Sequence, residues 1–285
     1  MIALTCEGIA VSMVPERGGK ITSLCALESE REWLEAPSRP VEGPGAGGDF
    51  DHGDMCGWDE MLPTIAPCRY PGTELDLPDH GELWDTSWSV SAISGSSVST
   101  WVEGRALPYR FERTLTLSPG RLHVEYRLSS TVDDVRVLWA AHPLFAQRPG
   151  TRIELGDAPA TLVHYGEGER PVQTWPAHGV CVEVDLAAGA SQKIFTHPAS
   201  EVASASLIDP DGAFLTMSWR REEVPCLGVW LDNAAYARHA VAALEPTTWS
   251  DDGLDVAVGA GAAWIVSRDR DRRWSLDVEL GCRAV

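Results

Sequence analysis

Hydrophobic and polar residues alternate with a period of two along much of the chain. The alternation is clearest over residues 121–128, 180–186, 213–219 and 274–280, where apolar side chains occupy every second position. Such a pattern is typical of a β-strand that has one face in a core and the other in water. No run with helical apolar spacing is longer than about two turns. The pattern therefore predicts a chain built almost entirely of strands.

Turn residues separate these segments at short intervals. The Ser-Pro-Gly sequence at 118–120 lies between the runs 111–117 and 121–128, which predicts a β-hairpin. A Pro- and Gly-containing turn at 15–19 separates two further short strands. There is no sequence repeat and no break in composition. We therefore expect an all-β protein, a sandwich or a barrel, that forms a single domain over residues 1–285.

The composition narrows the classes of protein that fit. With 285 residues, of which 44% are hydrophobic, the chain can bury a large core. A net charge of −19 argues against binding to nucleic acid and to anionic membranes, which both attract basic proteins. Seven cysteines without a C-x-x-C pair indicate free thiols in a reducing compartment. Residues 1–7 lack the regions of a signal peptide, so we expect a cytoplasmic protein. The sequence does not indicate the oligomeric state.

A long loop rich in Pro and Gly is predicted at 35–54, and we expect it to lie over a cleft. Within it, Asp49, Asp51 and Glu60 fall at positions one, three and twelve of an EF-hand loop. The glycine required at position six is replaced by Asp54, however, and no helical pattern flanks the segment. The interpretation is a solvated acidic loop over 49–60 and no metal.

Four short motifs carry side chains that suit sugar chemistry. His80 lies in a Pro-Asp-His-Gly turn, and His142 and Glu245 each precede a proline. Imidazoles move protons near neutral pH, and the guanidinium of Arg69 presents a fork of donors for paired hydroxyls. Taken singly, each residue fits an ordinary loop, core or surface position equally well. The same holds for the twelve tryptophans, whose flat faces suit sugar rings but also fill β-protein cores.

The order and spacing of these motifs resemble those of the aldose 1-epimerase (mutarotase) family, within the galactose mutarotase-like superfamily. The matching segments are 14–24, Arg69, His80-Gly81 with Trp88, His142-Pro143-Leu144-Phe145 and Leu244-Glu245-Pro246. The resemblance implies a large antiparallel β-sandwich. It also implies an isomerase that interconverts the α and β anomers of a sugar by ring opening and closure.

The resemblance also implies roles for individual residues. Glu245 would be the base that takes the anomeric proton, and His142 the acid that supplies one to the ring oxygen. His80 and Arg69 would hold the ring oxygen and the neighbouring hydroxyls. Asp232, at the end of a predicted strand, is a further candidate ligand for a substrate hydroxyl, and its charge could keep His142 protonated. No cofactor is implied, and the expected partner is a small-molecule sugar.

Two departures from the family pattern concern the pocket. The arginine that follows the family's His-Gly segment is Trp84 here, and residues 146–149 (Ala-Gln-Arg-Pro) replace the family's Asn-rich segment after the second histidine. The substrate is therefore expected to differ from that of a standard galactose mutarotase, and an acidic or modified sugar is one option.

Two other classes of function fit the same sequence. The first is a noncatalytic carbohydrate-binding or sensor module, which would not need Glu245 and His142 together. The second is an enzyme of different chemistry in the same cleft, such as a sugar isomerase, a lyase or a sugar-phosphate epimerase. A phosphate site would favour clustered Arg and Lys residues, and around Arg69 and His80 the charged residues are mostly acids.

Overall fold

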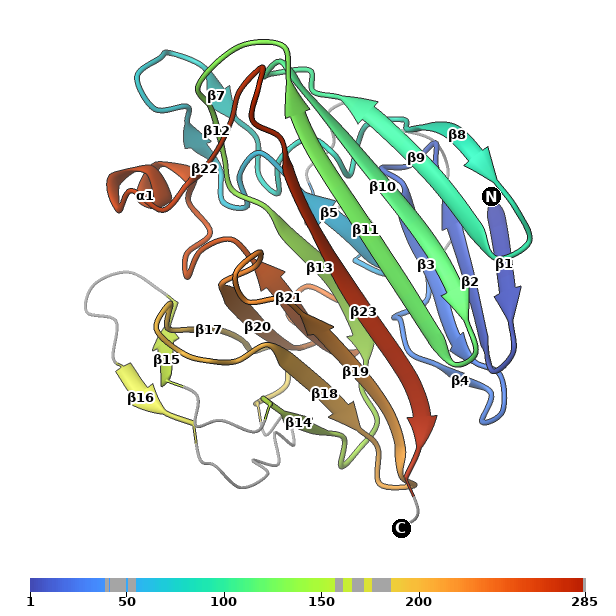
Figure 1. Cartoon of the computed structure of the whole chain (residues 1–285). Coiled ribbons are helices and arrows are strands. Elements are labelled where there is room, and N and C mark those ends of the chain that lie inside the picture. Colours follow the sequence, from blue (N-terminus) through green and yellow to red (C-terminus); the bar gives the residue numbers. More distant parts are fainter. Residues whose placement is uncertain are drawn as a thin grey trace.

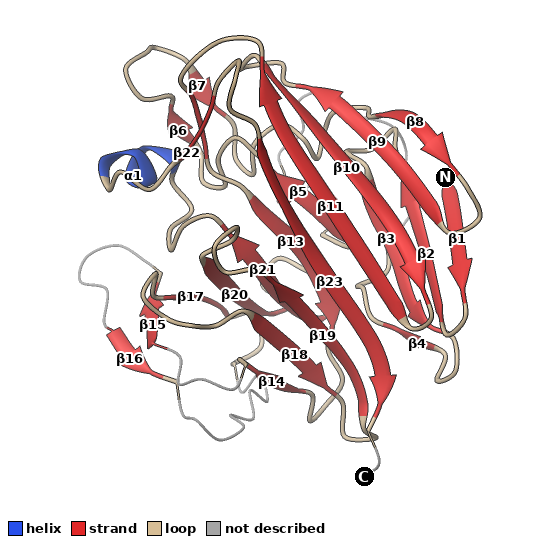
Figure 2. Cartoon of the chain, in the orientation of Figure 1, coloured by secondary structure: helices blue, strands red, loops and turns tan. Residues whose placement is uncertain are grey.

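The computed structural model describes residues 1–38, 41, 50, 55–156, 161–165, 172–175 and 186–283. These residues form twenty-three strands and one short helix, α1 (Leu254–Gly259). Figures 1 and 2 show how these elements are arranged. The all-β prediction is confirmed. Asp49, Asp51 and Asp54 of the acidic loop and most of the predicted strand 180–186 lie outside the described residues. No described helix has both the length and the apolar character needed to cross a bilayer.

Two large antiparallel sheets make up the fold. The eleven-stranded sheet has the order β1-β2-β3-β5-β13-β21-β20-β17-β15-β16, with β4 paired to β3. Its strands are β1 (Ile2–Cys6), β2 (Ile9–Val14), β3 (Lys20–Ala26), β4 (Arg31–Glu32), β5 (Trp58–Met61), β13 (Ala140–Ala146), β15 (Thr161–His164), β16 (Val172–Thr174), β17 (Ser191–Thr196), β20 (Cys226–Asn233) and β21 (Ala240–Thr247).

The eight-stranded sheet has the order β14-β18-β19-β23-β11-β10-β9-β8. Its strands are β8 (Ser89–Ile93), β9 (Ser97–Glu103), β10 (Tyr109–Ser118), β11 (Arg121–Ser130), β14 (Arg152–Glu154), β18 (Ser204–Ile208), β19 (Ala213–Trp219) and β23 (Arg272–Cys282). Two small sheets pair β6 (Cys68–Arg69) with β7 (Asp76–Leu77), and β12 (Val135–Val137) with β22 (Trp264–Val266). The hairpin predicted around 118–120 is confirmed as β10 and β11.

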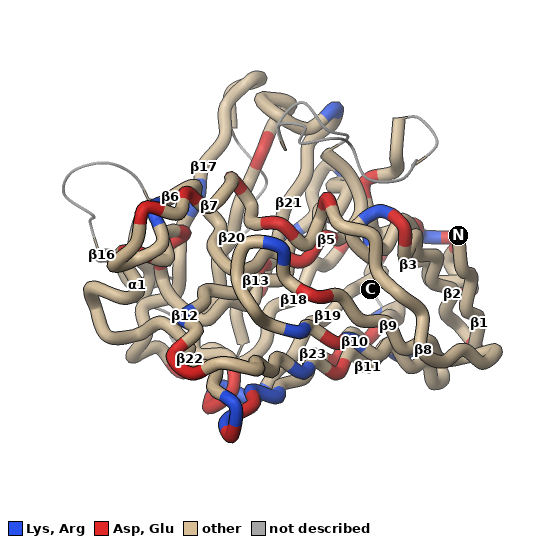
Figure 3. The backbone as a smooth tube through the Cα atoms, turned by 90° about the horizontal axis from the view of Figure 1, so that it is seen from above, with Lys and Arg blue, Asp and Glu red and all other residues tan. Residues whose placement is uncertain are grey.

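The two large sheets lie face to face, with the eight-stranded sheet in front in Figure 1. Their facing sides supply the main core, because alternate residues of each strand point inward. Leu115, Val124 and Leu276 are inward residues of β10, β11 and β23, and each is at most 1% exposed. The intervening residues carry charges of both signs on the outer surface, and Figure 3 shows acidic and basic positions interspersed along these strands.

One buried ion pair connects the two sheets. Arg113 of β10 and Glu60 of β5 are fully buried, and their Nη1 and Oε1 atoms lie 3.0 Å apart. The Tyr126 hydroxyl donates a hydrogen bond to Oε1 of Glu60, and the Trp139 indole donates one to Oε2. Burial raises the pKa of Glu60, and Arg113 opposes that rise. The carboxylate thus has two partners on the eight-stranded sheet and a third in Trp139, just before β13, which meets the need of a buried charge for partners.

Candidate functional site

A cavity of about 560 Å³ opens on the side of the eleven-stranded sheet that faces away from the eight-stranded sheet. Its described lining is Met55, Ile65, Ala66, Pro67, Asp79, His80, His142, Tyr165, Ser191, Gln192, Lys193, Trp230, Tyr236, Glu245 and Asp252. The strand period explains the placement, since Ala141 and Leu244 point into the core between the sheets. Their neighbours His142 and Glu245 therefore point to the opposite face.

Strand register brings His142 and Glu245 together. The pairing of β13 with β21 matches Ala140 with Thr247 and Leu144 with Ala243, which places His142 opposite Glu245. The Nε2 atom of His142 lies 3.6 Å from Oε1 of Glu245. Oε1 has no hydrogen-bond partner among the described residues, and neither does Nδ1 of His142. A buried acceptor and a buried ring nitrogen without partners, both lining a cavity, indicate a place for a polar ligand.

The second oxygen of Glu245 is held by a lysine. Nζ of Lys193, on β17, lies 2.8 Å from Oε2 of Glu245 and 2.8 Å from Oδ1 of Asp252. Burial raises the pKa of Glu245, the charge of Asp252 raises it further, and Lys193 opposes both effects. Glu245 is therefore a carboxylate that takes up a proton more readily than an ordinary glutamate.

His142 differs from its expected protonation state. Burial lowers the pKa of His142 well below its usual value, and the charges of His80, Lys193 and Lys20 lower it further. These effects favour the neutral imidazole near pH 7, in contrast to the protonated His142 expected from the sequence. Asp232 does not reverse this, because its carboxylate is directed at backbone N–H groups of the turn that follows, including those of Ala235 and Ala237.

His80 enters the cavity from the turn after β7. Its Nδ1 atom lies 2.7 Å from Oδ2 of Asp79, and its ring stacks on Phe50 with 3.8 Å between ring centroids. The rings of His80 and His142 are 5.6 Å apart. A glycine must follow, since Gly81 has a φ of 67° and a Cβ there would collide with the backbone of Leu62. The His-Gly motif thus has a steric basis in the chain's own packing.

Two of the five expected site residues are not brought to the cavity. Arg69 is exposed on β6, where its guanidinium pairs with Glu74 at 2.6 Å and Asp76 at 3.2 Å. The prediction that it converges on the cleft with the histidines is wrong, because the short β6–β7 hairpin places these acids beside it. Asp232 is fully buried and does not line the cavity. It supports the turn that carries Tyr236, which does.

Lys193 and Asp252 were missed by the sequence reasoning. A signal was present in the composition, because only two of the chain's 23 basic residues are lysines. The other, Lys20, is also buried, with its Nζ 2.5 Å from Oδ2 of Asp59. A chain that uses arginine for nearly every surface cation has placed both of its lysines in buried ion pairs.

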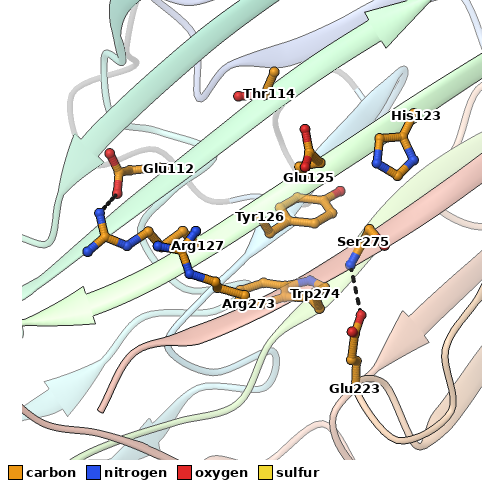
Figure 4. Close-up of a pocket in the computed structure, with 10 residues that line it drawn as sticks. All are labelled: Glu112, Thr114, His123, Glu125, Tyr126, Arg127, Glu223, Arg273, Trp274 and Ser275. Carbon is orange, nitrogen blue, oxygen red and sulfur yellow. Dashed lines mark hydrogen bonds and ion pairs between the residues drawn. The ribbon is translucent and has the colours of Figure 1, made fainter. Parts of the chain in front are cut away.

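A second hollow, of about 530 Å³, lies on the outer face of the eight-stranded sheet, over β10, β11 and β23 (Figure 4). Several of its charged side chains have local partners. Arg127 contacts Glu112 at 3.0 Å, and Glu223 accepts a hydrogen bond from the backbone of Ser275. No side-chain atom in this described lining is both buried and without a partner, apart from the indole nitrogen of Trp274. The first cavity is therefore the better candidate.

Among the described residues, no group of three or more His, Cys, Asp or Glu side chains is arranged to hold a metal ion. The acidic loop considered above lies partly outside those residues, so its lack of a metal stays an expectation. The cavity contains carboxylates, imidazoles and an ammonium group within a few ångströms of one another. Such groups can act as general acids and bases in proton transfer.

No protein-family model matches the sequence, and no curated protein sequence matches it either. Solved structures do match, over nearly the whole chain. A galactose mutarotase related enzyme from Lactobacillus acidophilus is 11% identical with a TM-score of 0.77, covering 98% of this chain and 97% of that one. A galactose mutarotase-like protein from Lactobacillus casei is 18% identical with a TM-score of 0.76, covering 99% and 100%. One from Clostridium acetobutylicum is 12% identical with a TM-score of 0.73, covering 99% and 95%. The chain therefore has the galactose mutarotase-like fold.

Proposed function

We propose that this protein is an aldose 1-epimerase, an isomerase that interconverts the α and β anomers of a sugar. One observation carries the proposal. Glu245 is fully buried, yet its Oε1 has no hydrogen-bond partner among the described residues and faces His142 in an open cavity. A buried carboxylate held ready in this way suits a general base. The fold shared with mutarotase-like structures supports the same conclusion.

The reaction needs one proton removed from the anomeric hydroxyl and one delivered to the ring oxygen. Glu245 is the proposed base. His142 lies within reach of the same sugar, and as a neutral imidazole it would donate a hydrogen bond to the ring oxygen rather than act as a cationic acid. His80, oriented by Asp79, would supply the proton itself. Ring closure on the other face returns both protons, so no group is consumed.

The charges of the described lining indicate the class of sugar. The lining carries three carboxylates, those of Asp79, Glu245 and Asp252, and one ammonium group, that of Lys193. An anionic substrate would be repelled by this arrangement. The proposed substrate is therefore an uncharged aldose, which disfavours the acidic sugar and the sugar phosphate considered from the sequence.

Glu245→Gln tests the proposal directly. Glutamine keeps the shape of the side chain but removes its basicity, so interconversion should fall about 10²- to 10⁴-fold while sugar affinity changes far less. The measurement is NMR saturation exchange between anomers over a panel of neutral aldoses. Glu125→Gln, in the hollow on the other sheet, is the matched control and should keep the parent rate.

Two outcomes would contradict the proposal. If Glu245→Gln interconverts anomers at the parent rate, Glu245 is not the base. If the parent binds an aldose but does not accelerate interconversion, the protein is the noncatalytic sugar-binding module that the sequence also allowed.

A further inference from the structure

Lys193 lies at the centre of the charged cluster in the cavity, with its side chain only 12% exposed. We infer that Lys193 is a positioning residue for the proposed reaction: its ammonium group holds the Glu245 carboxylate in place and in its charged form. The inference rests on the proposed function, since it concerns the readiness of the proposed base. It assigns a role to a residue that the sequence motifs do not include.

The sheet is built so that these two side chains can meet. Lys193 on β17 and Glu245 on β21 are separated by one strand, β20, in which Gly228 is paired with Glu245. A Cβ at Gly228 would lie 3.1 Å from Oε2 of Glu245. The missing side chain therefore leaves room for the carboxylate that Lys193 contacts, and a larger residue at 228 would press against it.

The titratable groups facing Glu245 come from four segments. They are Lys193 from β17, Asp252 from the segment after β21, His142 from β13 and His80 from the turn after β7. Lys193 lies 2.8 Å from a carboxylate oxygen of each of its two acidic partners, which makes it the nearest cation to both among the described residues. Without it, two carboxylates would share a buried site, and one of them would take up a proton near neutral pH.

Lys193 is suited to holding charge and not to transferring protons. Burial alone would lower its pKa, but the charges of Asp252 and Glu245 outweigh burial and raise it above the ordinary value for lysine. The ammonium group therefore stays charged through the range in which the proposed reaction would run. A residue that keeps its proton acts on the reaction through Glu245, so it positions the base and is not itself the acid.

The experiment is the pH dependence of kcat/KM in the parent and in Lys193→Met, which removes the charge at similar length. Removing an opposite charge at this distance raises a carboxyl pKa by about 1–3 units. The acidic limb of the profile should therefore move to higher pH by that amount. At pH values below the shifted limb, kcat/KM of Lys193→Met should be about 10- to 10³-fold lower than that of the parent. At alkaline pH it should recover toward the parent value. Lys193→Arg keeps the charge and should leave the limb near its parent position.

Lys20→Met is the matched control, because it removes the chain's other buried lysine, which pairs with Asp59 and not with Glu245. It should leave the acidic limb where it is, whatever it does to stability. A lowered rate in Lys193→Met with an unmoved limb would show that Lys193 has only a structural role and would overturn the inference.

A second readout does not depend on activity. The titration of Glu245 can be followed by ¹³C NMR of labelled glutamate carboxyls, with its signal assigned by its loss in Glu245→Gln. The midpoint should rise in Lys193→Met and stay near the parent value in Lys193→Arg, and equal midpoints in all three proteins would contradict the inference. If the parent does not interconvert anomers, the proposed function fails, while this titration still decides whether Lys193 keeps Glu245 ionised.

Discussion

At the scale of single residues, the protonation state of His142 separates two versions of the chemistry. Its pKa is lowered, above all by burial, which favours the neutral imidazole near neutral pH. We expect its imidazole ¹H–¹³C resonances to show no titration between pH 6 and pH 8, approximately the range over which an ordinary histidine titrates. A titration midpoint at 6.5 or above, measured by NMR and assigned with His142→Asn, would restore His142 as the acid.

The same shift has a consequence for stability. Because the folded-state pKa of His142 lies below its unfolded value of about 6.5, the unfolded chain binds the proton first as the pH falls. The contribution of His142 to stability is thus present above about pH 6.5 and is lost as the pH falls through the folded-state pKa. When the pH is lowered below about 6.5, His142→Asn should therefore lose less unfolding free energy than the parent.

The site residues differ in how far the sequence could reveal them. His80, His142 and Glu245 lie in short motifs whose local form, a Gly turn or a proline after the side chain, is visible in the sequence. Arg69 has a similar local setting, but its ion pairs with Glu74 and Asp76 follow from a tight hairpin that the sequence reading did not predict. Lys193 meets Glu245 only through strand register across β20, which no local pattern encodes.

At the scale of elements, the period of two and the turn residues were sufficient to predict hairpins but not the order of strands in the sheets. The β10–β11 hairpin follows from alternation around a Ser-Pro-Gly turn. The neighbours β5, β13 and β21 come from distant parts of the chain, and their pairing depends on long-range contacts. The cavity uses β13 and β21 together with β17 and β20, so its existence could be expected from the resemblance but not from the pattern.

The ion pair between the sheets leads to a prediction at this scale. Arg113→Met leaves the Glu60 carboxylate buried without its cation, which should cost about 3–5 kcal/mol of unfolding free energy. Arg121→Met removes an arginine from an exposed pair with Glu279 on the adjacent strands and should cost at most about 1 kcal/mol. Urea denaturation measures both. Equal losses in the two variants would show that the buried pair does not tie the sheets together.

At the scale of the whole molecule, the proposed site and the second sheet lie on opposite sides of the eleven-stranded sheet. Strands β13 and β21 contribute His142 and Glu245 to the cavity and Ala141 and Leu244 to the core between the sheets. A change on one face of these strands therefore acts on the packing of the other. This arrangement supports the proposal that residues 1–285 form one domain, in which binding and folding are linked.

A single domain should unfold in one cooperative step, and a sugar bound only to the folded state should stabilise all of it. At a sugar concentration of about 100 times Kd the gain is about 2.7 kcal/mol. Native-state hydrogen exchange tests this, because the slowest amides of β10 and β11 should gain the same protection as those of β20 and β21. If added sugar slows exchange only in β20 and β21, or if calorimetry resolves two transitions, the two sheets belong to separate folding units.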